Sequence, residues 1–147
     1  MFKENDMKTT DLRIGNLIGI KETALHADGC NHSEAIFEIE EIKNDVVQFK
    51  GYHANEYYKD LKPIPLTEQW LLDFGFNQSI EGQWYVHFNE MCLTLYEDLP
   101  QYIVEIHDME MDKSSIFLMS IKYVHQLQNL YFALAQEELI LKERSKE

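Results

Sequence analysis

Residues 63–76, PIPLTEQWLLDFGF, carry start and stop signals for one short helix, and strand-like segments lie on both sides of it. Thr67 is a favourable N-cap residue, because its hydroxyl can accept a hydrogen bond from an unpaired backbone N–H of the first turn. Gly75 can adopt the left-handed conformation that commonly follows the end of a helix. The sequence therefore predicts a two-turn helix over residues 68–74. Its buried side chains are expected to be Trp70, Leu71 and Phe74.

Strand-like segments separated by turns fill the chain before this helix. Residues 35–42, AIFEIEEI, alternate apolar and acidic side chains, and residues 46–51, VVQFKG, return as a hairpin partner after a tight turn. Residues 12–20 predict a strand with an internal bend, and residues 57–61 predict one more strand. Four or five short strands in about sixty residues are typical of a small, strongly bent SH3-like β-barrel.

After the helix, the sequence predicts an antiparallel meander followed by a second helix. The strand-like segments lie at residues 83–88, 91–96, 101–107 and 115–120. The last of these, SIFLMS, is almost wholly apolar, which indicates a central strand. Residues 122–141 carry apolar side chains three or four positions apart, which predicts a helix with one apolar stripe. The members of the stripe are Val124, Leu127, Leu130, Tyr131 and Leu134.

The predicted fold class is therefore α+β. A flexible arm over residues 1–10 precedes an SH3-like β region over residues 11–62. A connection stiffened by proline leads into an α+β region over residues 63–147, in which the short helix precedes an antiparallel sheet packed by the C-terminal helix. The sequence leaves open whether the two regions form one compact domain.

Three segments together resemble a family of short uncharacterised proteins: LRIGNLI near the start, KPIPLTEQWLLDFGF in the middle and YVHQLQNLYFALAQEELIL near the end. This family recurs in gut anaerobe genomes and in their phages and mobile elements. The resemblance implies an intracellular protein of phage or mobile-element type, and it implies no particular activity. Two features depart from the family: the polar insert at residues 21–33, and Gln136, near which the family often carries a glycine that ends the helix.

The net charge of −13 is the most unusual bulk property of the chain. Nucleic-acid backbones and anionic membrane surfaces both attract clustered Lys and Arg, so neither is an expected partner. No Lys or Arg lies between Lys62 and Lys113, an interval that contains ten acidic residues. Solubility accounts for such an imbalance, and the alternatives are a basic partner or mimicry of a DNA backbone.

The cysteine pattern and the N-terminal residues indicate a cytoplasmic protein. Cys30 and Cys92 form neither a CxxC pair nor a disulfide framework, so reduced thiols are expected. Residues 1–12 lack the apolar core of a signal peptide, and no apolar run approaches the ~18 residues of a membrane span. We therefore expect no membrane partner.

The polar insert contains four potential metal ligands at alternate positions, His26, Asp28, Cys30 and His32. Side chains two residues apart share a face of an extended strand, so all four could converge on zinc or another borderline metal. Structural zinc sites usually combine ligand pairs from distant segments, however, and the sequence offers no second pair. A solvated loop is therefore the favoured interpretation, with these four residues as the candidates for metal binding.

His125 lies beside Gln126, Gln128 and Asn129 in the predicted C-terminal helix, and these side chains could form a polar recognition face. His125 also borders the apolar stripe through its neighbour Val124. This position favours a packing histidine whose ring is satisfied by a backbone carbonyl.

The sequence contains no GxSxG, HExxH, GxGxxG or GxxxxGK[ST] motif, so we expect a protein that is not an enzyme and holds no cofactor. Tyr52, Tyr57 and Tyr58 follow the N-terminal hairpin. Such tyrosines often line peptide-binding grooves of small barrels, although they are also common strand residues. The leading hypothesis is a module that binds another protein. The alternatives are an acidic DNA mimic that inhibits a nucleic-acid-binding protein, and a metal-dependent enzyme that uses residues 26–32.

Overall fold

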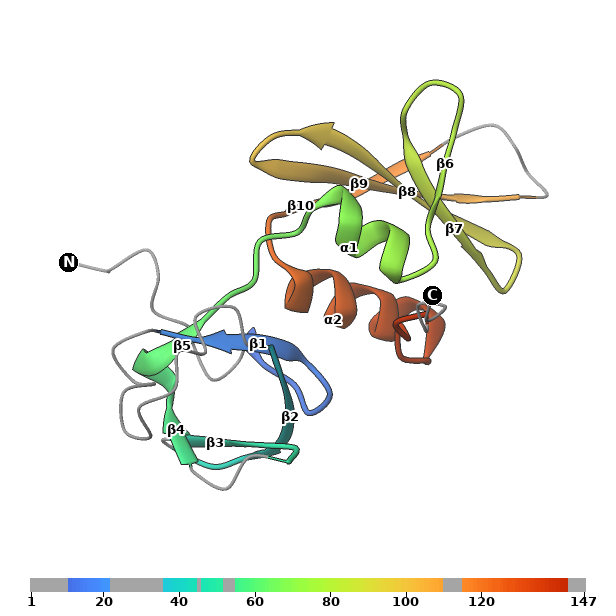
Figure 1. Ribbon diagram of the computed structural model, residues 1–147. Helices are drawn as coiled ribbons and strands as arrows, with labels where there is room; N and C mark the ends of the chain where they lie inside the picture. The colour runs from blue at the N-terminus through green and yellow to red at the C-terminus, as the bar shows by residue number, and fades with distance from the viewer. Residues whose placement is uncertain (1–10, 22–35, 45, 52–54, 110–114, 143–147) are drawn as a thin grey trace, which may run out of the picture. The chain divides into compact units, whose positions relative to one another are not determined.

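The computed structural model describes residues 11–21, 36–44, 46–51, 55–109 and 115–142. In this part of the chain the protein is α+β, with two antiparallel sheets and a C-terminal helix, which confirms the predicted fold class (Figure 1). The chain divides into two compact units. The first unit comprises residues up to Ile64 together with Tyr123–Asn129, and the second comprises Pro65–Lys122 and the residues from Leu130 onward. The predicted arm over residues 1–10 lies outside the described residues.

The first unit contains a five-stranded antiparallel sheet with strand order β4-β3-β2-β1-β5. Its strands are β1 (Leu17–Ile20), β2 (Phe37–Ile42), β3 (Val46–Phe49), β4 (Asn55–Tyr57) and β5 (Leu61–Lys62). An apolar core forms against it from Leu12, Ile18, Ile20, Ile39, Val47, Phe49 and Leu61. Among the described residues no pairing joins β4 to β5, so hydrogen bonds do not close this sheet into the predicted barrel.

The prediction of a single strand over residues 57–61 is wrong. A 3-10 turn, η3 (Tyr58–Asp60), separates β4 from β5, which lie at opposite edges of the sheet. The Tyr58 side chain packs against the core of the first unit, and its hydroxyl donates a hydrogen bond to the Lys43 carbonyl oxygen at 2.6 Å. These contacts hold the turn where propensity alone favours an extended segment, since tyrosine is a good strand residue.

Helix α1 (Glu68–Asp73) belongs to the second unit and forms where the sequence predicts a helix. The Thr67 hydroxyl accepts a hydrogen bond from the Trp70 N–H at 3.4 Å, as expected for an N-cap. At the other end, Gly75 has a φ of 89°. The N–H of Gly75 donates to the Leu72 carbonyl and that of Phe76 to the Leu71 carbonyl, each at 2.9 Å, which is a Schellman motif. Leu71 is fully buried, Phe74 is buried and Trp70 is half-buried.

The sheet of the second unit has strand order β10-β9-β8-β7-β6. Its strands are β6 (Asn77–Gln78), β7 (Trp84–Phe88), β8 (Met91–Asp98), β9 (Gln101–Asp108) and β10 (Ile116–Ile121). Hairpin turns at Asn89-Glu90 and Leu99-Pro100 join β7 to β8 and β8 to β9, which confirms the predicted antiparallel meander. One face is apolar and buried, through Trp84, Leu93, Leu95, Tyr102, Val104 and Ile121.

The prediction that the apolar SIFLMS segment is a central strand is wrong. Residues 116–120 of this segment belong to β10 (Ile116–Ile121), which lies at the edge of the sheet and pairs with β9. Only Ile121 at its end is fully buried, whereas Ile116 is 62% exposed and Phe117 is 59% exposed. An apolar run is compatible with a central strand, but the order of strands in the sheet depends on pairing with distant residues, which the run itself does not encode.

Helix α2 (Val124–Ala135) is the predicted C-terminal helix. Its stripe residues Val124, Leu127 and Tyr131 are buried, and in the second unit the Tyr131 ring packs edge-on against Phe88 of β7, with centroids 5.5 Å apart. The helix ends before the predicted limit at residue 141. Gln136, directly after the helix, adopts a left-handed φ of 60°. No helix within the described residues is long and apolar enough to cross a membrane.

Candidate functional site

Several residues that the sequence singles out lie outside the described part of the chain. They are His26, Asp28, Cys30, His32 and Tyr52. Among the residues that the structure describes, no group of three or more His, Cys, Asp and Glu side chains could hold a metal ion. The metal-site candidates therefore stay a prediction from the sequence.

The two described tyrosines of the predicted binding surface do not have the same environment. Tyr58 is half-buried and packs on the core of the first unit, with its hydroxyl bound to a backbone carbonyl. Tyr57 is 56% exposed on β4, opposite Val46 of β3. Tyr58 thus packs within the first unit, whereas the Tyr57 side chain is the more exposed of the two.

The polar residues of α2 that suggested a recognition face are used within the first unit. Asn16 is fully buried, and its side-chain N–H donates to Oδ1 of Asn129 at 2.8 Å. Arg13 Nε donates to the same oxygen at 3.2 Å, and Asn129 Nδ2 donates to the Asp11 carbonyl at 3.0 Å. The amide of Asn129 therefore links the turn that precedes β1 to the helix.

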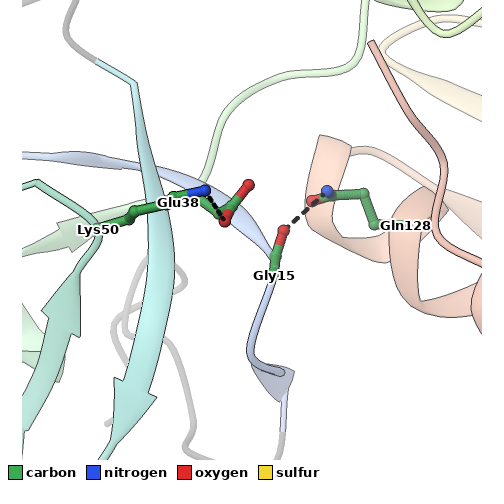
Figure 2. A network of polar contacts seen from close by, with 4 residues as sticks. All are labelled: Gly15, Glu38, Lys50 and Gln128. Carbon is green, nitrogen blue, oxygen red and sulfur yellow. Dashed lines mark hydrogen bonds and ion pairs between the residues drawn. The ribbon is translucent and has the colours of Figure 1, made fainter.

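Gln128 completes this polar network. Its Oε1 accepts a hydrogen bond from the Leu17 N–H at 2.8 Å, and its Nε2 donates to the Gly15 carbonyl at 3.2 Å, the bond drawn in Figure 2. The Gln128 amide thus satisfies one backbone donor and one backbone acceptor at the start of β1, as the backbone of a neighbouring strand would. Figure 2 also shows the Lys50–Glu38 ion pair at 4.0 Å, which is exposed and contributes little stability. We call Asn16, Gln128 and Asn129 the amide network.

His125 is buried in the first unit and stacks on Tyr123, with ring centroids 5.9 Å apart and 11° between the planes. Burial lowers the pKa of His125 from 6.5 to about 4, and the charge of Asp11 opposes this shift. Its Nδ1 has no hydrogen-bond partner among the described residues, so the expected backbone-carbonyl acceptor is not found at this atom. The imidazole is therefore neutral at pH 7 and packs as an apolar ring.

The face of the second sheet opposite its buried side brings together side chains that the sequence analysis did not connect. The strand registers align His87 with Cys92 and Cys92 with His107 across β7, β8 and β9. The next row contains Tyr85, Thr94, Glu105 and Phe117. The rings of Tyr85 and His87 lie 5.4 Å apart. We call this surface the outer face of the second sheet.

Two-residue turns provide the signal by which these rows could have been predicted. A turn at Asn89-Glu90 pairs Phe88 with Met91, which places His87 opposite Cys92. The turn at Leu99-Pro100 pairs Asp98 with Gln101 and fixes the next register in the same way.

The outer face carries negative charge. Burial raises the pKa of the Tyr96 phenol, and a hydrogen bond to Glu105, the charge of Glu105 and the charge of Glu81 raise it further. Strands β6 to β10 contain no Lys or Arg.

A group of exposed apolar residues lies on β10 and directly after its neighbour β9. Ile116, Phe117 and Met119 are all exposed on β10, and Met109, which follows β9, is 46% exposed. A register shift between Phe117 and Met119 marks a bulge in the pairing with β9. The strand contains no charged residue and no proline, which are two of the devices, besides a bulge, that prevent an edge strand from pairing with another chain.

Comparisons of this chain with protein-family models, with curated proteins and with solved structures find no match. The function is therefore argued from the geometry of the chain itself. We define the β10 edge as the side of Ile116–Ile121 that faces away from β9, and it is the strongest candidate binding site among the described residues.

Proposed function

We propose that this protein is a non-enzymatic binding module for another protein, and that the β10 edge receives a segment of that partner by strand addition. The observation that carries the proposal is an edge strand of six residues with exposed Ile116, Phe117 and Met119. Strand addition satisfies the backbone donors and acceptors of such an edge, while apolar contacts on either face supply specificity.

We infer a second, smaller surface for partner binding on the first unit. We propose that its short-stranded meander is an SH3-like β region, in line with its five-stranded antiparallel order. Tyr57 on its edge strand β4 and Tyr52 in the sequence before it would then contribute to partner binding. We place the protein in the cytoplasm, in a phage or mobile-element setting, on the strength of the family resemblance.

The alternative of a DNA mimic requires acidic side chains over one continuous face. In the second sheet, Glu90 and Asp108 lie at one end of β8, whereas Glu97 and Asp98 lie at the other end. These positions do not favour a continuous acidic face, so strand addition remains the proposed function.

Selection from a phage-displayed library of random dodecapeptides tests the proposal with the full chain. We expect the wild-type protein to enrich a set of sequences that a Phe117→Lys, Met119→Lys variant does not, because lysines on an edge strand oppose pairing. A Leu72→Lys, Ile80→Lys variant is the matched control, since it removes two exposed apolar residues elsewhere with the same charge change. Equal enrichment by wild type and the β10 variant contradicts the proposal.

A further inference from the structure

We propose that the segment that binds the β10 edge is an extended strand with a Lys or Arg side chain facing Phe117 on the outer face of the second sheet. This inference rests on the proposed function and specifies the chemistry of the partner. The argument begins with the row that Glu105 and Phe117 form across β9 and β10.

The charge of the second sheet selects a basic partner. Its five strands carry no Lys or Arg, and β8 and β9 carry Glu97, Asp98, Glu105 and Asp108. Glu105 is half-buried and accepts a hydrogen bond from Tyr96, so its carboxylate is held on the outer face. A cationic side chain is the group that adds an attractive interaction at this place, and a carboxylate would be repelled.

The spacing of strands sets which position of the partner strand carries the charge. Neighbouring strands lie about 4.8 Å apart, so a strand added to β10 would place one residue beside Phe117 and about 10 Å from the backbone of Glu105. Lysine and arginine are long enough to cross the Phe117 ring toward the Glu105 carboxylate. Phe117 is 59% exposed, and its ring can take part in a cation–π contact with the same side chain.

A second copy of this chain fits the edge less well than a basic segment does. Pairing of β10 with β10 would bring together two strands without a cationic side chain, each beside its own Glu105. Both chains carry a net charge of −13 as well. The residues opposite Phe117 on the partner are therefore assigned to a basic strand of another protein.

The sequences of the selected dodecapeptides provide the first test. We expect Lys or Arg at one position, flanked at alternate positions by apolar residues, among peptides that the β10 variant fails to enrich. Peptides that depend on the β10 edge but are neutral or acidic would overturn this inference and leave the proposed function standing. If the wild-type protein enriches no peptide that the β10 variant fails to enrich, the proposed function itself is overturned.

The second test measures the affinity of one selected basic dodecapeptide by fluorescence anisotropy with the full chain. Glu105→Gln is expected to weaken binding about two- to fivefold at low salt, the range of a solvent-accessible ion pair, and the difference should shrink as salt is added. Glu41→Gln, an exposed residue of β2 with the same charge change, is the control. Equal effects of the two substitutions would contradict the contact with Glu105.

Sedimentation of the full chain over a range of concentrations tests whether a second copy of this chain, instead of a basic segment, binds the β10 edge. We expect the sedimentation coefficient to be the same for wild type and for the Phe117→Lys, Met119→Lys variant. Self-association of the wild type that the variant abolishes would assign the β10 edge to a second copy and would overturn the inference.

Discussion

The amide network of the first unit and the β10 edge of the second unit reverse the usual placement of polar and apolar residues. Asn16 and Gln128 are buried and use their amides to satisfy backbone and side-chain groups. Ile116 and Phe117 are apolar and exposed. The comparison teaches that a polar helix face can be structural, while an apolar strand can be the surface available to a partner.

Removal of the Gln128 amide should have the largest effect on folding. Gln128→Ala leaves the Leu17 N–H and the Gly15 carbonyl without their partner at a site where Gln128 is 2% exposed. We expect the free energy of unfolding to fall by about 2–4 kcal/mol, because each unsatisfied buried group costs about 1–3 kcal/mol. Urea titration measures this free energy of unfolding. Gln69→Ala on the exposed face of α1 is the control, and a loss no greater than in this control would contradict a structural amide network.

The pH dependence of folding sharpens the comparison through His125. Its folded-state pKa of about 4 lies below the ordinary value of 6.5, so protons bind preferentially to the unfolded chain. The stability that the neutral ring contributes is therefore present above pH 6.5 and is lost as the pH falls toward 4. We expect a loss of about 2 kcal/mol between pH 7.5 and pH 5.

Urea titrations of wild type and His125→Gln at several pH values isolate this contribution from that of the carboxylates, which both proteins share. The difference between the two proteins should shrink as the pH falls from 7.5 to 5. A difference that stays constant over this range would mean that the His125 ring does not titrate with the lowered pKa.

The end of α2 offers a stabilising substitution. Gln136 has a φ of 60°, a conformation that glycine adopts without the steric cost borne by other residues. Gln136→Gly should raise the free energy of unfolding by about 1 kcal/mol. Ala133→Gly, within the same helix and exposed, should lower it by about 1 kcal/mol. Thermal melts distinguish the two, and destabilisation by both would argue against a left-handed helix end at Gln136.

Substitutions at the β10 edge should have the smallest effect on the free energy of unfolding. Phe117→Ser and Met119→Ser change exposed residues, so each should alter the free energy of unfolding by less than about 0.5 kcal/mol. Peptide binding should nevertheless be lost. A large loss of stability in urea would show that these side chains pack within the folded chain, and the contrast with the amide network would then disappear.

Local signals in the sequence were sufficient for a good part of the fold. Thr67 and Gly75 mark the ends of α1, and alternating apolar residues locate β7, β8 and β9. The apolar stripe locates α2, because three-residue and four-residue spacing follows directly from helix geometry. These features depend on residues close together in the chain, where a single sequence carries its clearest information.

The remaining features depend on partners far apart in the chain. Gln128 binds Leu17 across 111 residues, so nothing near Gln128 indicates that its amide is buried. The position of β10 at the sheet edge follows from the order of five strands. The outer-face rows are an intermediate case, because counting from the Asn89-Glu90 turn would have placed His87 beside Cys92.

Hydrogen exchange of the full chain, with and without a selected basic dodecapeptide, tests the central claim most directly. We predict that the peptide slows exchange of the amides of Ile116–Ile121 and leaves those of β4 (Asn55–Tyr57) unchanged. This result would place the partner strand on the β10 edge. Protection confined to β4, or protection nowhere in β10 at saturating peptide, would contradict it.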